Sequence, residues 1–312
     1  MSVVQELSRQ KRAETGAKPK PKARDGKAAL LFLGPWILGF VLITLGPMLA
    51  SLYLAFTDYN LLSPPEWSGL DNFQAMLDDS RLLNSLRVTF IYVFVGVPIS
   101  LAVALAVAVL LDRGMRGLAF YRSVFYLPSL LGASVAIAVL WRQMFGYSGL
   151  VNQLLEMLGI QGIGWISDPR TALGALILLN VWTFGAPLVI FLAGLRQIPQ
   201  MYYESAELDG CGKLAQFFRI TMPLLTPIIF FNLVLGIISS FQAFTQAYVV
   251  SDGRGGPADS TMFFTLYLYQ EGFAEFNMGY AAAMAWLLLV IIAVFTLVNF
   301  VAAKYWVHYD DN

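Results

Sequence analysis

Charge is scarce in this sequence, and long parts of it contain none. Asp, Glu, Lys and Arg make up only 13 % of its 312 residues, whereas a typical soluble domain carries about 25 %. Apolar residues make up 58 %. This composition excludes a disordered protein, a nucleic-acid-binding protein and a typical cytosolic enzyme.

Cysteine and histidine are each present only once. Cys211 is the single cysteine, which excludes a disulfide within the chain. His308 is the single histidine, and one histidine without a pair of cysteines cannot form a histidine-rich metal site. We therefore expect neither a metal ion nor another cofactor.

Six stretches without a charged residue are long enough, or nearly so, to cross a membrane. A helix rises about 1.5 Å per residue and needs about 20 apolar residues to cross a hydrocarbon core of about 30 Å. The stretches run from 19 to 32 residues and are rich in Leu, Val, Ile, Ala and Phe. They predict an all-α polytopic membrane protein with six transmembrane helices, at about 28–56, 88–111, 123–141, 171–195, 223–251 and 276–303.

Glycine and proline occur inside these stretches, for example at Gly46, Pro47 and Pro128. In a membrane bundle, neighbouring helices and Ser or Thr side chains can satisfy the carbonyl groups that proline leaves free. We therefore expect kinked spans and not interrupted ones.

The distribution of Lys and Arg predicts the orientation. If the N-terminus is cytoplasmic, the inside segments carry 15 Lys and Arg residues and the outside segments carry 5, in agreement with the positive-inside rule. Both termini are then cytoplasmic. The predicted organisation is a disordered basic tail at 1–27, a six-helix domain at 28–304 with a cytoplasmic loop at 196–222, and a C-terminal tail at 305–312.

The predicted spans contain no ionisable residue. Proton- and ion-coupled carriers usually need such residues inside the membrane, so their absence argues against that class and against a membrane-embedded hydrolase. The fourth and fifth spans do carry amides and hydroxyls beside aromatic rings, notably from Ser239 to Gln246. These groups suit a neutral solute rich in hydroxyls, although hydrogen bonds between helices would use the same residue types.

The cytoplasmic loop is long and patterned. Residues 202–209 predict a short helix, Gly210 and Gly212 break it, and 213–220 predict a second short helix with Phe217 and Phe218 facing the membrane or a partner. Two short helices around glycines form a compact knob that suits docking into a cleft of another protein.

Here the chain resembles the permease subunits of binding-protein-dependent ATP-binding-cassette (ABC) importers. Their signature is Glu-Ala-Ala, three residues, Gly, nine residues, Ile, one residue and Leu-Pro. This chain has Glu204-Ser205-Ala206, Gly210, Ile220 and Met222-Pro223 at those offsets. It departs from the signature at Ser205 and Met222, which are close in size to the expected residues.

The resemblance extends over nearly the whole chain after the tail. The first span, WSGLDNF at 67–73, FYRSVFYLP at 120–128 and SDGRGGP at 251–257 are similar to segments of the maltose and glycerol-phosphate type, and to the larger permease of each pair. The resemblance implies the type I ABC importer permease fold and a place in the bacterial cytoplasmic (inner) membrane.

The resemblance also implies partners and a mechanism. This chain would form a heterodimer with a second homologous permease, bind two cytoplasmic ATPase subunits and receive solute from an extracellular or periplasmic binding protein. It would not itself be an enzyme, because its one Gly-Lys pair, GCGKL at 210–214, lacks the upstream glycine and the Ser or Thr of a phosphate-binding loop.

Site residues follow from the same resemblance, position by position. The residues expected to couple to the ATPase are Glu204, Ser205, Ala206, Asp209, Gly210, Phe217, Phe218, Ile220 and Pro223. The residues expected along the solute path are Asn180, Phe184, Gly236, Ser240, Phe241 and Gln242, with Ala243 beside them.

Two alternatives to sugar import remain at this stage. The same machinery could import a polyol, an aminosugar or a glycerol-phosphate compound. A secondary carrier or a channel belongs to a different class, and it would work without an ATPase.

Overall fold

The structure is a computed structural model that describes residues 23–112, 117–132 and 134–308. Most of the tail predicted at 1–27 and the last residues of the tail predicted at 305–312 lie outside the described residues. The chain falls into two units, Met1–Tyr53 and Leu54–Asn312.

The first unit contains one continuous helical stretch. Its middle is a π-turn, in which the Gly46 N–H donates to the Val41 carbonyl, five residues back. Pro47 follows, and because proline has no N–H the ordinary α-helical bond of that residue is missing. This first span is therefore distorted but not interrupted, as predicted. The helices are α2 (Ala23–Gly39), η1 (Phe40–Leu45) and α3 (Gly46–Leu54).

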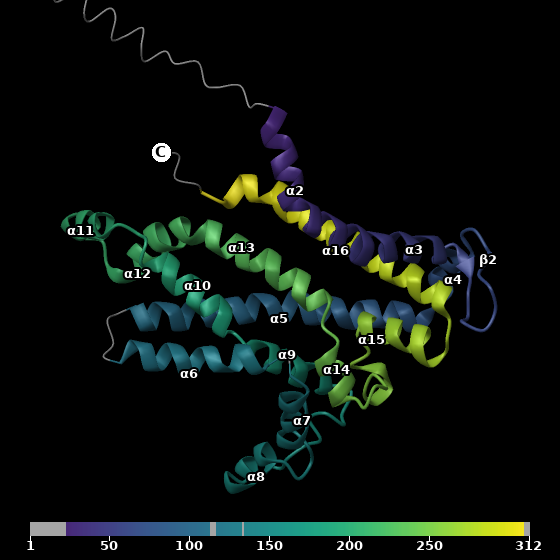
Figure 1. The fold of residues 1–312 in the computed structure, drawn as a ribbon. Coiled ribbons are helices and arrows are strands. Elements are labelled where there is room, and N and C mark those ends of the chain that lie inside the picture. Colours follow the sequence, from purple (N-terminus) through teal and green to yellow (C-terminus); the bar gives the residue numbers. More distant parts are fainter. Residues whose placement is uncertain (1–22, 113–116, 133, 309–312) are drawn as a thin grey trace, which may run out of the picture. The chain divides into compact units, whose positions relative to one another are not determined.

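The second unit is built around one long helix, α5 (Ser80–Asp112), which packs against helices from later parts of the chain (Figure 1). Its buried side chains include Tyr92, Val97 and Ala104, and they meet Phe191, Phe241 and other apolar side chains in one core. The helices around α5 are α9 (Ala172–Trp182), α10 (Gly185–Leu195), α13 (Met222–Phe241) and α16 (Met278–Trp306).

Four helical stretches are long and apolar enough to cross a membrane: Leu31–Leu54, Ser80–Asp112, Lys213–Phe241 and Met278–Trp306. Two further pairs of helices meet the same test if each bent pair is one span, which brings the number to six. One such pair is α9 and α10, whose axes differ by 42°. The break lies at Thr183 and Phe184, and the Thr183 hydroxyl donates to the Asn180 carbonyl at 2.8 Å.

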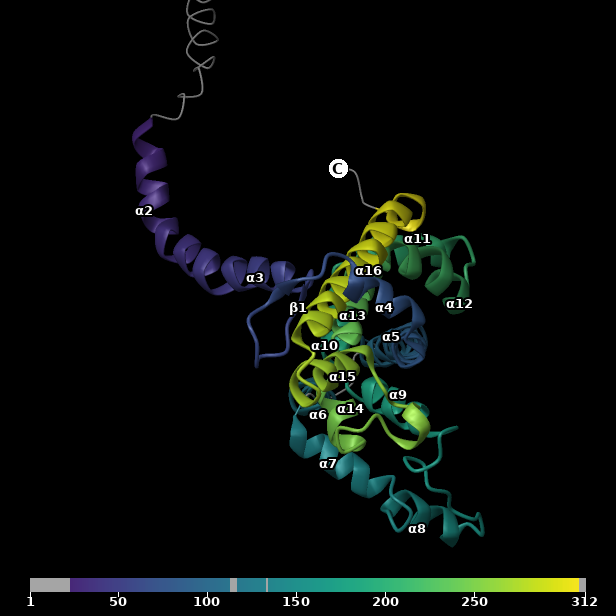
Figure 2. The same ribbon diagram turned by 90° about the vertical axis from the view of Figure 1, so that its right-hand side faces the viewer.

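The other pair departs from the sequence prediction of a kinked but uninterrupted span at 123–141. α6 (Leu118–Leu131) and α7 (Val135–Met144) differ in direction by 99°. Ser134 has an extended backbone, and its side chain accepts a bond from the Ile137 N–H, so it starts a new helix. In both views α7 projects, together with α8 (Leu150–Met157), away from α5 and α13 (Figures 1 and 2).

The predicted fifth span, 223–251, is also not one continuous helix. α13 ends at Phe241, residues 242–244 are non-helical, and α14 (Thr245–Val250) starts afresh. The Ala243 carbonyl accepts a bond from the Thr265 hydroxyl at 2.5 Å instead of a helical partner. The polar cluster from Ser239 to Gln246 therefore straddles a helix break.

The remaining elements of the second unit are short. Strands β1 and β2 pair antiparallel, with Thr57 opposite Trp67. The elements not yet given are β1 (Thr57–Asp58), β2 (Glu66–Trp67), α4 (Asp71–Asp78), α11 (Gln200–Leu208), α12 (Lys213–Gln216), η2 (Phe217–Thr221), η3 (Pro257–Asp259), α15 (Phe264–Tyr269) and η4 (Gln270–Ala274).

Candidate functional site

The patterned loop folds as two short helices around a sharp turn. α11 ends in a Schellman motif, in which the Cys211 N–H donates to the Ala206 carbonyl at 2.8 Å and the Gly210 N–H donates to the Glu207 carbonyl at 3.0 Å. Gly210 has φ +75°, a left-handed conformation that side chains disfavour. A Cβ at Gly210 would meet no atom within 4 Å, so backbone conformation and not crowding calls for glycine there.

Side chains hold the turn closed. Lys213 forms an ion pair with Glu207, and this hydrogen bond and charge lower the pKa of the Glu207 carboxyl. The Gln216 side chain is buried and donates to the Cys211 carbonyl at 3.1 Å. The Tyr203 and Thr221 hydroxyls are 2.8 Å apart, which joins α11 to η2. Sequence reasoning missed Gln216, Tyr203 and Thr221, because their pairing depends on how the turn folds.

The outer face of this turn exposes large apolar side chains. Leu208 is 90 % exposed, Leu214 is 74 % exposed and Phe218 is 62 % exposed. Phe217 is half-buried, with its ring 5.1 Å from that of Phe218. An exposed apolar patch of this kind is typical of a protein-binding surface.

The other residues predicted in this loop differ in exposure. Glu204 and Ser205 are exposed on α11, and within the described part of the chain Glu204 has no ion-pair partner. Asp209 is exposed beside the turn. Ala206, Ile220 and Pro223 are half-buried.

Two of the residues predicted for the solute path contact α5. The Asn180 side chain lies beside Gly96, where an added Cβ would be 3.0 Å from Nδ2. That Nδ2 atom is buried and has no hydrogen-bond partner among the described residues. Gly236 of α13 packs against Val97 of α5, the residue after Gly96. An added Cβ on Gly236 would come within 2.8 Å of Val97 Cγ1.

The end of α13 combines core and surface residues. Phe241 is buried between Phe90 of α5 and Phe295 of α16, with ring centroids 5.5 and 5.7 Å away. Ser240 is buried as well, and Ala243 is half-buried. Phe184 is half-buried at the break between α9 and α10, 5.9 Å from the ring of Phe125 in α6.

Gln242 is more exposed than its neighbours Ser240 and Phe241. It is exposed, and it lines a groove of about 580 Å³ along α16. The rest of the lining is mainly apolar and includes Leu288, Ile292 and Leu297. Among the predicted path residues, Gln242 therefore contributes a polar side chain to the lining of a mainly apolar groove.

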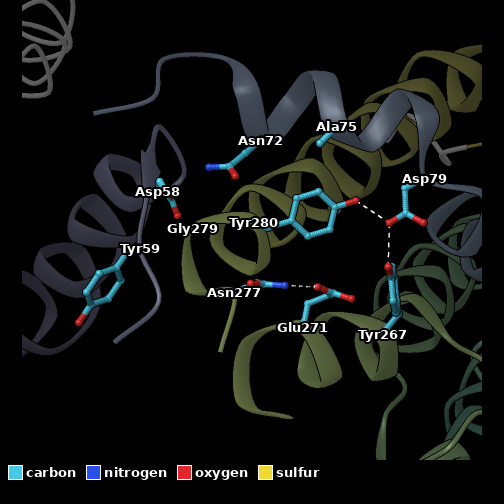
Figure 3. Close-up of a pocket in the computed structure, with 10 residues that line it drawn as sticks. All are labelled: Asp58, Tyr59, Asn72, Ala75, Asp79, Tyr267, Glu271, Asn277, Gly279 and Tyr280. Carbon is cyan, nitrogen blue, oxygen red and sulfur yellow. Dashed lines mark hydrogen bonds between the residues drawn. The ribbon is translucent and has the colours of Figure 1, made fainter. Parts of the chain in front are cut away.

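A second cavity of about 400 Å³ is polar and lies at the N-terminal end of α16 (Figure 3). Tyr267 and Tyr280 both donate to Asp79 Oδ2, at 2.8 and 2.7 Å. On the far side Asn72 donates to the Ala55 and Thr57 carbonyls at 3.0 and 2.9 Å. The sequence carried a signal for Asn72, which belongs to the WSGLDNF segment, but none for the tyrosines.

Asp79 also caps α5. Its carboxylate accepts from the backbone N–H groups of Arg81 and Leu82 at 2.9 and 3.0 Å, so α5 starts at Ser80, eight residues before the predicted span. Burial would raise the pKa of the Asp79 carboxyl. The four hydrogen bonds, two from tyrosines and two from backbone, outweigh burial and lower it.

No metal centre is evident in the residues that the structure describes, where no three His, Cys, Asp or Glu side chains are grouped so as to hold an ion. Two carboxylates at the polar cavity accept from uncharged donors: Asp79 from the Tyr267 and Tyr280 hydroxyls, and Glu271 from the Asn277 amide at 2.9 Å.

Comparison with known proteins identifies similar chains. A family profile described as "Binding-protein-dependent transport system inner membrane component" matches residues 73–306. A "Probable ABC transporter permease protein YesP" of Bacillus subtilis (strain 168) is 50 % identical over 302 residues, which cover 96 % of this chain and 98 % of the relative. The "Lactose transport system permease protein LacF" of Rhizobium radiobacter is 32 % identical over 280 residues, covering 88 % of this chain and 93 % of the relative.

A solved structure has a similar fold. It is a chain from the crystal structure of a bacterial alginate ABC transporter in complex with an alginate pentasaccharide-bound periplasmic protein. The TM-score is 0.78 at 20 % identity, and the match covers 91 % of this chain and 98 % of the other.

Proposed function

Because this chain belongs to the inner membrane components of binding-protein-dependent transport systems, we propose that it forms one half of the solute path of a sugar importer. It is a permease subunit of an ABC importer with the type I fold, which confirms the resemblance drawn from residues 204–223. It is not the catalytic subunit, since ATP is hydrolysed on a separate chain. The family also excludes the secondary carrier and the channel considered above.

The observation that carries the coupling role is the turn between α11 and η2. It presents Glu204 and the apolar side chains of Leu208, Leu214 and Phe218 together on an exposed surface. We propose that one of two ATPase subunits binds this surface, with Glu204 forming a charge-assisted hydrogen bond to a basic group. The second half of the membrane pore would come from a homologous permease in a heterodimer.

We propose a sugar or oligosaccharide as the solute. The support is the names of the relatives, which include a lactose permease, together with neutral polar groups at the end of α13. Among the predicted path residues, Asn180 and Gln242 carry the amides that would bind sugar hydroxyls: Nδ2 of Asn180 is buried without a hydrogen-bond partner among the described residues, and Gln242 lines a groove. The alternatives of a polyol, an aminosugar or a glycerol-phosphate compound are decided by a ligand screen on the cognate binding protein.

The test of the coupling proposal is co-purification from cells that express this chain together with its neighbouring genes. The wild-type chain should bring down a second permease and an ATPase, and Glu204→Lys should lose the ATPase while staying in the membrane. An ATPase that binds the lysine variant as well as the wild type would contradict the role given to Glu204.

The test of the solute path uses the same complex in proteoliposomes, with the sugar found by the screen. Asn180→Ala and Gln242→Ala should lower uptake while leaving basal ATP hydrolysis nearly unchanged. If neither substitution changes uptake, the path does not run past these amides.

A further inference from the structure

The backbone turns sharply between α11 and the helical stretch Lys213–Phe241. The turn contains Gly210 in a left-handed conformation and Gly212, whereas α12, η2 and α13 follow one another without a break. In η2 the Met222 N–H reaches back five residues to the Phe217 carbonyl, and Pro223 has no N–H to restore the α-helical pattern. Glycine leaves the backbone of the turn more conformational freedom than other residues would, so contacts between side chains across the turn help to fix the position of α11.

α11 is also held loosely by packing, since none of its residues is buried. Two contacts close the turn at the first residues of the stretch Lys213–Phe241: Glu207 with Lys213, and Gln216 with the Cys211 carbonyl. The ion pair is exposed, with the Lys213 side chain 81 % exposed, so solvent weakens it.

A second side-chain pair spans the turn and reaches further along the stretch. Tyr203 and Thr221 are 18 residues apart in sequence, and their hydroxyls are 2.8 Å apart. Tyr203 precedes Glu204 on α11, and Thr221 is the N-cap residue of α13 and is 5 % exposed. Both pairs link α11, the helix that carries the docking surface, to the stretch Lys213–Phe241 (Figure 1). The pair of Tyr203 and Thr221 differs from the ion pair in having a buried partner on that stretch.

We propose that the bond between Tyr203 and Thr221 is the rigid link that carries movement of the ATPase from α11 into α13. The phenol ring is stiff, with two rotatable bonds, and Thr221 is fixed by burial, so the pair resists bending that the glycines allow. Tyr203 and Thr221 are thus positioning residues that act through α13. This inference rests on the proposed function, which it extends from the docking surface to the way the membrane helices respond.

The experiment uses the complete complex in proteoliposomes and a membrane-impermeant maleimide as the probe. A cysteine is placed at Gln242, at the end of α13, with Cys211 replaced by serine in every variant. The labelling rate is measured with and without ATP plus vanadate. In the parent we expect ATP to change this rate, because the nucleotide moves α13.

Tyr203→Phe and Thr221→Val each remove one hydroxyl and little volume. Each should reduce the ATP-dependent change in labelling rate by roughly threefold to tenfold, the effect of losing one hydrogen bond, while the ATPase still co-purifies. Thr221→Ser keeps the hydroxyl and should restore the response. The double variant should behave like either single one, because both remove the same bond.

Tyr202→Phe is the matched control, since Tyr202 is the exposed neighbour of Tyr203 on α11. A parent-like response in both Tyr203→Phe and Thr221→Val would overturn the inference alone. Loss of ATPase binding in those two variants would overturn it too, because the pair would then shape the docking surface. A parent complex that contains no ATPase would overturn the proposed function and this inference together.

Discussion

Gly210 and Gly212 lie two residues apart in the coupling turn, yet only the first is in the left-handed region. Gly210 has φ +75°, whereas Gly212 has φ −71° and ψ 159°, which any residue adopts. An added Cβ would meet no atom within 4 Å at either position. Because an added Cβ is not crowded at either position, a difference between the two alanine variants reports the effect of backbone conformation alone.

We predict that Gly210→Ala weakens coupling and that Gly212→Ala does not. An alanine held left-handed costs about 1–2 kcal/mol, which favours opening of the Schellman turn and displaces Glu204 and Leu208. The measurement is the amount of ATPase that co-purifies with each variant. Equal losses in both variants would mean that the turn tolerates no side chain for a reason other than its φ angle.

Asp79 makes the stability of the fold depend on pH. Hydrogen bonds hold its pKa below the ordinary value of 3.8 in the folded chain, so the ionised form stabilises the fold. That contribution is complete above pH 3.8 and is lost as the pH falls through the lower pKa of the folded state.

We predict that Asp79→Asn removes this part of the acid dependence. The change should also lower the melting temperature at neutral pH by roughly 2–4 °C, as expected for about 1 kcal/mol. Asp78→Asn is the control, because Asp78 is exposed at the end of α4. Thermal unfolding in detergent between neutral pH and pH 3 measures both variants, and parallel curves for the wild type and Asp79→Asn would refute the assignment.

At the scale of elements, two glycines in neighbouring helices have opposite surroundings. Gly185 starts α10 where it crosses α6, and an added Cβ would come within 2.4 Å of the Phe125 carbonyl oxygen. Gly174 lies inside α9, where an added Cβ would meet nothing within 4 Å. The close crossing of α6 and α10 therefore depends on Gly185.

We predict that Gly185→Ala destabilises the protein by about 1–3 kcal/mol, because the two backbones must separate. Gly174→Ala should be neutral or slightly stabilising, since alanine favours the helix. Thermal unfolding in detergent compares them. A stable Gly185→Ala protein would indicate that α6 and α10 are not tightly packed.

The elements also indicate what sequence alone can predict. Charge-free runs indicate where apolar helices lie, because an unpaired charge in hydrocarbon is costly, but the runs at 123–141 and 223–251 each contain a break between helices. The ends of the helices are harder to place. The start of α5 depends on capping by Asp79, and the end of α13 depends on a bond from Thr265 to the Ala243 carbonyl.

The same contrast holds in the candidate site. The turn at Gly210 was predictable, since a Schellman motif is set by residues close in sequence. The bond between Tyr203 and Thr221 was not, because it forms only after the turn has brought the two together. The cluster of Asp79 with Tyr267 and Tyr280 joins residues 188 and 201 positions apart, which no local pattern reveals.

At the scale of the whole molecule, the predicted orientation divides the net charge of zero between two opposed surfaces. With the N-terminus inside, 15 of the 20 Lys and Arg residues are cytoplasmic. The orientation that this distribution predicts can be tested with the native cysteine, because Cys211 belongs to the loop assigned to the cytoplasm.

We predict that a membrane-impermeant maleimide leaves Cys211 unlabelled in intact cells and labels it in inverted vesicles. Leu62→Cys in a Cys211→Ser background should behave in the opposite way, since Leu62 is 91 % exposed in the segment assigned to the outside. Labelling of Cys211 in intact cells would reverse the predicted topology.

The polar cluster at Asp79 has a consequence for how this protein is made. Its partner Tyr280 lies on the last helix, and on that helix the Gly279 N–H donates to the Tyr59 carbonyl at 3.1 Å, while an added Cβ on Gly279 would come within 2.1 Å of the Thr57 carbonyl oxygen. During synthesis these early residues leave the ribosome long before their partners exist. The segment around Thr57 and Tyr59 therefore stays incompletely bonded until α16 has been inserted, and a chain that stops before α16 exposes that unfinished surface to proteases.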